Sequence, residues 1–187
     1  VTSIVRVTSN HAPTILRFMD TGALGLHVPW VNSAAEAVDV VRSVKYSPAG
    51  VRGLAGVRAA DYSQIPLSDY VKQANEETLV IVHIETQDAV AALPEMVTLA
   101  GIDVIFIGPT DLSQSYGVPG DPQHPLVQAA INQIVEIVAA SDKALGIMVP
   151  NAQTAVQWRE RGALYIATGL ESLMMPAARE YLNQVHR

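Results

Sequence analysis

Short apolar runs alternate along the chain with segments whose apolar residues recur at helical spacing. The runs are rich in Val, Ile and Leu, as expected of strands buried on both faces of a parallel sheet. We predict strands at 3–7, 25–29, 79–84, 102–107, 145–149 and 164–168. Predicted helices lie at 13–20, 34–44, 68–77, 87–99, 125–141, 152–161 and 171–185. Because strand and helix alternate without a hairpin signal, the pattern predicts an α/β fold with a parallel sheet.

About six βα units fall short of the eight that close a (β/α)8 TIM barrel, yet we expect such a barrel. The alternative is an open doubly wound sheet, but no glycine-rich phosphate turn follows the first strand. Candidate functional residues instead stand at the ends of several strands, as they do in barrels. The chain also opens without methionine, almost directly inside an apolar run. We therefore expect residues 1–187 to be a single barrel domain, N-terminally incomplete, with two units upstream of Val1.

Two carboxylates follow neighbouring predicted strands. Glu85 comes directly after the run 79–84, and Asp111 follows the run 102–107. The helix between these runs makes the strands parallel, so both carboxylates are expected at one edge of the sheet. Carboxylate oxygens suit a hard divalent cation. The alternative is that Glu85 only begins a helix and that Asp111 caps a helix starting at Leu112.

The tetrapeptide Gly108-Pro109-Thr110-Asp111 favours the metal site. Glycine and proline predict a tight turn just past the strand, which leaves the backbone N–H groups of Thr110 and Asp111 pointing outward at a helix start. A cation site and an anion cradle would then lie side by side. Such a pair would chelate a small 2-oxo acid.

Three further residues are candidates for the same edge. Arg6, near the end of the first strand, would stabilise an enolate oxygen if it shares the edge with Glu85; otherwise it pairs with a surface acid. His83 lies two residues before Glu85 and so on the same face, as either a satisfied core histidine or a partner of the site. His27 also lies inside a strand and is the weaker candidate. Asp20 is expected to be a solvent residue at a helix end.

Composition excludes several classes of function. The formal net charge of −6 argues against a nucleic-acid partner, because no basic stripe could neutralise phosphates. No apolar run is long enough for a membrane span and no export signal opens the chain, so we expect a cytoplasmic protein without a membrane partner. The absence of cysteine excludes thiolate metal sites and thiol catalysis. Lys45, Lys72 and Lys143 lie in polar segments, which disfavours a Schiff-base aldolase.

Six segments together resemble one known family. They are IVRVTSN, FMDTGALGLHVPWVNSAAEA, YSPAGVRGLAGVRAADY, IVHIETQDAV, GIDVIFIGPTDLSQSYG and LGIMV. Across essentially the whole chain they are similar to the HpcH/HpaI family of metal-dependent class II pyruvate aldolases, of the 4-hydroxy-2-oxoheptanedioate or 2-keto-3-deoxy acid aldolase type. The resemblance implies a barrel of the phosphoenolpyruvate/pyruvate superfamily. It also implies reversible cleavage of 4-hydroxy-2-oxo acids to pyruvate and an aldehyde with Mg²⁺, Mn²⁺ or Co²⁺.

The same resemblance implies roles for individual residues. Glu85 and Asp111 match the metal ligands, and Asp111 with Thr110 matches the cradle for the pyruvate carboxylate. Arg6 matches an arginine on the pyruvate carbonyl oxygen, Asp20 an acid near the site that a neighbouring subunit can supply, and Met148 a lining residue of the aldehyde pocket. His83 stands where the family commonly has glutamine, beside the substrate.

The resemblance also carries expectations about assembly and about what lies outside the chain. It implies a homo-oligomer, a hexamer built as a trimer of dimers, in which the last helix is often swapped between subunits. The family's acid/base histidine and its aspartate partner are expected upstream of Val1. Two other functions stay open. One is an oxaloacetate decarboxylase or a CoA-linked acid lyase that uses the same enolate, and the other is a non-catalytic oligomeric barrel whose carboxylates are helix caps.

Overall fold

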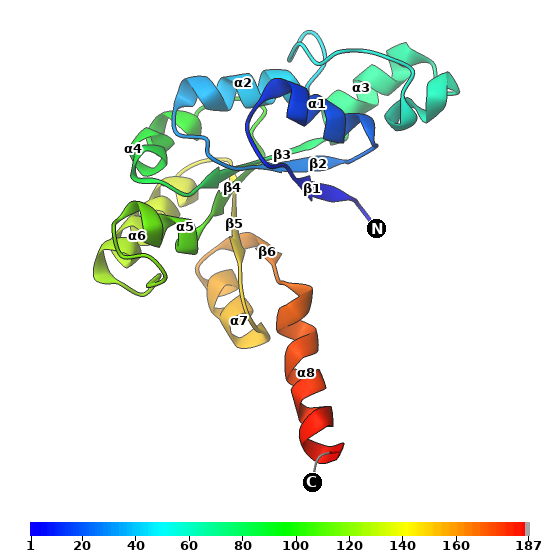
Figure 1. Ribbon diagram of the computed structural model, residues 1–187. Helices are drawn as coiled ribbons and strands as arrows, with labels where there is room; N and C mark the ends of the chain where they lie inside the picture. Colours follow the sequence, from blue (N-terminus) through cyan, green and yellow to red (C-terminus); the bar gives the residue numbers. More distant parts are fainter. Residues whose placement is uncertain (186–187) are drawn as a thin grey trace.

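The computed structural model describes residues 1–185, and its centre is one parallel sheet of six strands. The strands are β1 (Ile4–Arg6), β2 (Gly25–Val28), β3 (Leu79–Ile84), β4 (Val104–Ile107), β5 (Ala144–Met148) and β6 (Ala163–Ala167). Their order in the sheet is their order in the chain, so each strand pairs with the next. The sheet curls as a half-barrel, from β1–β3 across to β5 and β6 (Figure 1). The α/β class and the parallel sheet are confirmed, while the closed eight-stranded barrel stays a prediction.

Helices follow the strands and cover the outer face of the curl (Figure 1). They are α1 (Ala12–Asp20), α2 (Ala34–Val44), α3 (Leu67–Glu77), α4 (Gln87–Met96), α5 (Pro109–Ser115), α6 (Pro125–Ala139), α7 (Ala152–Glu160) and α8 (Leu170–Val185), with a short 3-10 helix, η1 (Arg58–Ser63). Local caps fix several starts. The Ser33 hydroxyl accepts from the Glu36 N–H at 3.2 Å, and the Thr86 hydroxyl accepts from the Ala89 N–H at 3.1 Å.

Strand β3 divides its side chains between the two faces of the sheet. Val80, Val82 and Ile84 belong to the main core between the sheet and its helices, whereas Ile81 belongs to a smaller cluster on the inner face. All four are fully buried. This alternation is the period of two that a strand imposes, and it directs the next residue of the inner set, His83, towards the hollow of the curl.

Two local expectations are corrected. The helix after β4 begins at Pro109 with Gly108 as its N-cap, and the Leu112 N–H already donates to the Gly108 carbonyl at 2.9 Å. Asp111 therefore lies within the first turn and is not the cap of a helix that starts at Leu112. The Lys45 side chain is buried, although the polar sequence around it suggested an exposed lysine. Its Nζ donates to the carbonyls of Asn75 and Thr78 at 2.8 and 2.7 Å, which satisfies the ammonium near the start of β3.

The last helix differs from the others because it extends away from the rest of the molecule (Figure 1). None of its residues is buried. Its large apolar side chains, Leu170, Leu173, Met174, Met175, Tyr181, Leu182 and Val185, are each 48 to 67 % exposed. Within residues 1–185, no helix has the length and apolar character needed to cross a membrane.

Candidate functional site

A cavity of about 760 Å³ opens at the carboxyl ends of the strands. This is the end of the sheet where parallel α/β folds place their binding sites. Its wall brings together residues from all six strands and the turns that follow them. Six of the residues singled out from the sequence line it, together with His27: Arg6, His83, Glu85, Thr110, Asp111 and Met148.

Glu85 lies at the bottom of this cavity and is only 2 % exposed. Its Oε1 accepts from Nδ1 of His83 at 2.7 Å and lies 3.6 Å from the Arg6 guanidinium. Its Oε2 accepts from the Trp30 N–H at 3.2 Å. Burial by itself would raise the pKa of Glu85, but the donors His83 and Trp30 and the charge of Arg6 together hold that pKa below its usual value. The group is therefore a carboxylate at neutral pH, ready to bind a cation.

The turn at Gly108 brings Asp111 into the wall of the same cavity as Glu85. Ile84 of β3 pairs with Ile107 of β4, so Glu85 and Gly108 leave the sheet as neighbours. A Cβ atom on Gly108 would lie 2.7 Å from Cγ of Glu85, closer than real Cβ contacts allow. Glycine is thus required here for the approach of the carboxylate. The first turn of α5 then carries Thr110 and Asp111, whose N–H groups have no acceptor inside the helix.

The donor set fits a hard divalent cation. Glu85 and Asp111 offer carboxylate oxygens to one cavity, and Mg²⁺ binds through one or two carboxylates together with oxygens from substrate or water. Among residues 1–185, no group of three or more His, Asp or Glu side chains is gathered as a metal cage. The protein part of the site would thus consist of these two carboxylates, with the other positions open to a ligand.

Arg6 and Met148 stand at opposite sides of the cavity mouth. The Arg6 side chain, at the end of β1, is 53 % exposed, and Met148, at the end of β5, is 54 % exposed. Both can therefore meet a ligand without a change in the core. Arg6 brings a fixed positive charge next to Glu85, and Met148 brings a flexible apolar surface.

Asp20 does not line this cavity. It ends α1, and its Oδ1 accepts from Nη2 of Arg52 at 3.0 Å. The Arg52 guanidinium is buried and lies 4.7 Å from the centroid of the Tyr46 ring, so this pair is held in place by packing as well as by charge. Arg52 thus forms its ion pair within its own chain. A catalytic part for Asp20 stays a prediction, and it would require a neighbouring subunit.

The structure brings the weaker candidate His27 to the site and adds Tyr165, which the sequence did not single out. His27 of β2 lies with its Nδ1 2.8 Å from Nε2 of His83 and its Nε2 2.9 Å from the Tyr165 hydroxyl of β6. Glu85, His83, His27 and Tyr165 therefore form one continuous chain of hydrogen bonds. His27 lies on the strand next to that of His83, whereas Tyr165 is far away in the sequence and carried no such signal.

The position of His27 predicts a pH dependence of stability. Burial, with smaller effects of His83 and Arg6, lowers the pKa of His27 from 6.5 to about 4. Between pH 6.5 and about pH 4, the unfolded chain binds a proton at His27 that the folded chain does not bind. The free energy of unfolding should therefore fall as the pH drops from about 6.5 to about 4, and this contribution is complete above pH 6.5.

Urea unfolding at several pH values measures this effect against the variant His27→Gln, which cannot titrate. Because the ring is only partly buried, we expect the wild type to lose about 1–2 kcal/mol more than the variant over this range. The exposed His11→Gln serves as the matched control and should follow the wild type. Parallel pH profiles of wild type and His27→Gln would contradict the prediction.

Comparisons with known proteins all lead to one family. The model of the HpcH/HpaI aldolase/citrate lyase family matches residues 1–177. The 4-hydroxy-2-oxo-heptane-1,7-dioate aldolase of Escherichia coli is 41 % identical over 181 residues, which are 96 % of this chain and 68 % of that protein.

Two solved structures share the fold at appreciable identity. An HpcH/HpaI aldolase/citrate lyase family protein from Burkholderia cenocepacia J2315 superposes with a TM-score of 0.92 at 32 % identity, covering 100 % of this chain and 74 % of that one. The HpcH/HpaI aldolase from Desulfitobacterium hafniense DCB-2 gives 0.86 at 26 % identity, covering 98 % and 72 %. The resemblance noted in the sequence is confirmed: the chain belongs to the HpcH/HpaI aldolase/citrate lyase family.

Proposed function

We propose that this protein is a divalent-metal-dependent aldolase that cleaves 4-hydroxy-2-oxo acids reversibly to pyruvate and an aldehyde. The observation that carries the proposal is the meeting of Glu85, Asp111 and Arg6 in one cavity, two anions and one cation around a space of substrate size. The name of the Escherichia coli relative, a 4-hydroxy-2-oxo-heptane-1,7-dioate aldolase, supports the same reaction class.

Each residue of the cavity has a distinct part in this proposal. Glu85 and Asp111 would hold Mg²⁺, Mn²⁺ or Co²⁺, which when bound would supply a Lewis acid for the 2-oxo group of the substrate. The N–H groups of Thr110 and Asp111 bind the substrate carboxylate, as the open first turn of a helix can. When a base takes the 4-hydroxyl proton, the C3–C4 bond breaks to release the aldehyde and the pyruvate enolate, and Arg6 contacts the 2-oxo oxygen and stabilises its negative charge.

The remaining residues shape the site around this reaction. Met148, exposed at the opposite side of the mouth, lines the space for the aldehyde. His83 donates to Oε1 of Glu85 and so orients that carboxylate while presenting its ring to the substrate space. Apolar side chains such as Phe106, Ile147 and Met148 also line the cavity and suit the carbon chain of an aldehyde.

Two assays test the proposal on the purified protein. Exchange of the pyruvate methyl protons with D₂O, followed by proton NMR, should depend on added Mn²⁺ and should stop with EDTA. Pyruvate release from a 4-hydroxy-2-oxo acid, followed with lactate dehydrogenase, should exceed release from oxaloacetate. Faster release from oxaloacetate would favour a decarboxylase that uses the same enolate. No binding of Mn²⁺ or pyruvate by calorimetry would favour a non-catalytic barrel.

We further propose that the protein is a homo-oligomer, a hexamer built as a trimer of dimers, in which a second copy covers α8. The helix exposes apolar side chains along its whole length, and an exposed apolar helix of this size is a usual sign of an interface. One of these apolar residues is Leu182, which is 50 % exposed and is followed in the sequence by the polar Asn183.

The adjacent pair Leu182 and Asn183 offers a matched test of this interface. Leu182→Asp places a charge in the apolar stripe and should shift the molar mass from the oligomer towards the monomer. Asn183→Asp adds the same charge to a polar position and should leave the mass unchanged. Sedimentation velocity measures both, and a monomeric wild type or an intact Leu182→Asp oligomer would contradict the proposal.

A further inference from the structure

The hydrogen-bonded chain from Glu85 to Tyr165 crosses the inner face of the sheet from β3 to β6. Its three links measure 2.7 Å from Glu85 to His83, 2.8 Å from His83 to His27 and 2.9 Å from His27 to the Tyr165 hydroxyl. Only Glu85 and His83 belong to the site proposed above. They are extended by His27 of β2, the weaker candidate from the sequence, and by Tyr165 of β6, which was not predicted.

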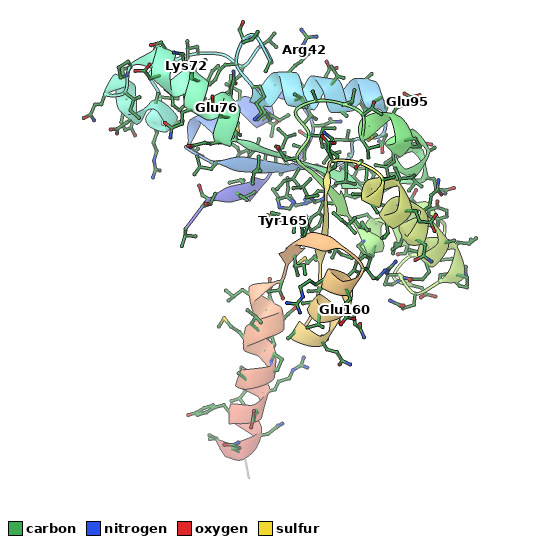
Figure 2. The ribbon with its side chains drawn as sticks, turned by 180° about the vertical axis from the view of Figure 1, so that it is seen from behind. Arg42, Lys72, Glu76, Glu95, Glu160 and Tyr165 are labelled. Carbon is green, nitrogen blue, oxygen red and sulfur yellow. The ribbon has the colours of Figure 1, made fainter. Side chains whose placement is uncertain are left out.

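Gly146 lets Tyr165 reach this chain. It lies on β5 between Phe106 of β4 and Tyr165 of β6, and it pairs with both. A Cβ on Gly146 would lie 2.8 Å from the Phe106 ring and 3.4 Å from Cβ of Tyr165. The missing side chain leaves space across β5, and the two rings approach to a centroid distance of 6.0 Å. Tyr165 projects from β6 towards the inner side of the curl (Figure 2).

The charge of Glu85 fixes the direction of the first hydrogen bond, and with a neutral His83 it sets the order of the other two. A carboxylate can only accept, so Nδ1 of His83 must carry a proton. A neutral His83 then has an Nε2 that can only accept, and Nδ1 of His27 must donate to it. His27 in turn presents an accepting Nε2 to the Tyr165 hydroxyl, whose proton completes the series. Each ring is held in its Nδ1–H form, and each donor points towards Glu85.

Two shifts of pKa agree with this arrangement. Burial lowers the pKa of His27 to about 4, so the ring is neutral at physiological pH. Burial also raises the pKa of Tyr165, so its hydroxyl keeps its proton. Phe106 adds a steric restraint, because its ring stacks on His83 at 4.8 Å and meets His27 edge-on at 4.9 Å. The packing restricts the rotation of both imidazole rings, and the hydrogen bonds determine which nitrogen of each ring carries the proton.

We propose that His27 and Tyr165 are positioning residues for Glu85, which act through His83 by holding its Nδ1–H on Oε1 of the carboxylate. The inference rests on the proposed function in taking Glu85 as a metal ligand, and it assigns parts to two residues outside the predicted site. Partners of this kind commonly set how well a ligand is oriented for its metal. The series ends at a hydroxyl on the far strand, so the geometry of Glu85 depends on how β6 lies against β2.

Tyr165→Phe is the direct test because it removes one hydroxyl and keeps the ring. Without the hydroxyl proton, Nε2 of His27 loses its donor and the His27 ring is held at Nδ1 alone, while the carboxylate of Glu85 still requires Nδ1–H on His83. Nitrogen-15 NMR of histidine-labelled full-length protein at pH 8 distinguishes the two protonated forms. We expect Nδ1–H for His27 and His83 in the wild type. In the variant, His83 should keep Nδ1–H, and the Nε2 resonance of His27 should shift because that nitrogen has lost its hydrogen-bond donor.

Binding of Mn²⁺ gives a second readout on the same samples. Tyr165→Phe should weaken it roughly 10-fold, the lower end of the usual range for neighbours of metal ligands. Tyr62→Phe is the matched control, because Tyr62 is 67 % exposed and lies outside the cavity, and it should change neither measurement. An unchanged Mn²⁺ affinity in Tyr165→Phe, or a doubly protonated His83 in the wild type, would overturn the proposal.

A pair of substitutions at His27 separates positioning from packing. Glutamine carries both an acceptor and a donor, so His27→Gln can keep the order of hydrogen bonds, whereas His27→Leu fills similar space and keeps neither. We expect Mn²⁺ affinity in the order wild type, His27→Gln, His27→Leu. An equal loss of Mn²⁺ affinity in the two variants would mean that His27 contributes only by packing. A wild type that binds no Mn²⁺ would instead refute the metal site. The NMR result would still show in which direction the hydrogen bonds between Glu85 and Tyr165 run.

Discussion

Replacing Glu85 by glutamine is expected to abolish binding of Mn²⁺ and the metal-dependent exchange of pyruvate protons. The variant keeps the shape of the side chain but loses the negative charge that Trp30, His83 and Arg6 surround. Neighbours of metal ligands already change affinity about 10- to 100-fold, so loss of a ligand itself should exceed roughly 100-fold. Isothermal titration with MnCl₂ and the D₂O exchange assay measure the two effects.

Asp111→Asn should give the same loss, because the second carboxylate of the cavity comes from the first turn of α5. Glu95→Gln is a suitable control for both variants. Glu95 is exposed on α4 and does not line the cavity, and Figure 2 shows it on the outer side of the molecule. Metal-dependent turnover retained by either Glu85→Gln or Asp111→Asn would remove the basis of the proposed site.

Replacement of Arg6 by methionine should lower kcat for aldol cleavage roughly 100-fold, because loss of one group that stabilises a developing oxyanion typically costs that much. The half-exposed side chain packs against little, so the fold should tolerate the change. Arg6→Lys keeps the charge but loses the planar fork, and its kcat should fall between those of wild type and Arg6→Met. Steady-state kinetics with pyruvate release measures both.

Arg17→Met provides the control for this prediction, since Arg17 is exposed on α1 and does not line the cavity. Its kinetics should match those of the wild type. A normal kcat in Arg6→Met would mean that the guanidinium near Glu85 serves only to balance its charge.

The sequence predicted the elements well wherever a run had a single interpretation. The strand 79–84 and the helix 34–44 have the predicted bounds, because a β-branched run and a Ser33 cap each favour one local structure. The meeting of Glu85 and Asp111 in one cavity also followed from the sequence, since parallel neighbouring strands end at the same edge. Those inferences needed only local pattern and connectivity.

The rest of the site depends on register and on gaps between distant side chains. Tyr165 reaches His27 only because Gly146 carries no side chain on the strand between them, and neither residue signals this alone. The burial of Lys45 likewise depends on two carbonyls about thirty residues away. Such contacts are set by packing of the whole sheet, which the hydrophobic pattern does not specify.

The alternation of β3 separates two kinds of evolutionary change. Val80, Val82 and Ile84 face the helices and carry stability, whereas His83 faces the hollow where the reaction is proposed to occur. A substitution at an inward position can therefore alter the choice of substrate without disturbing the packing between sheet and helices. Descendants of this chain could diversify their chemistry by exchanging every second residue of a strand while the outward positions preserve a common scaffold.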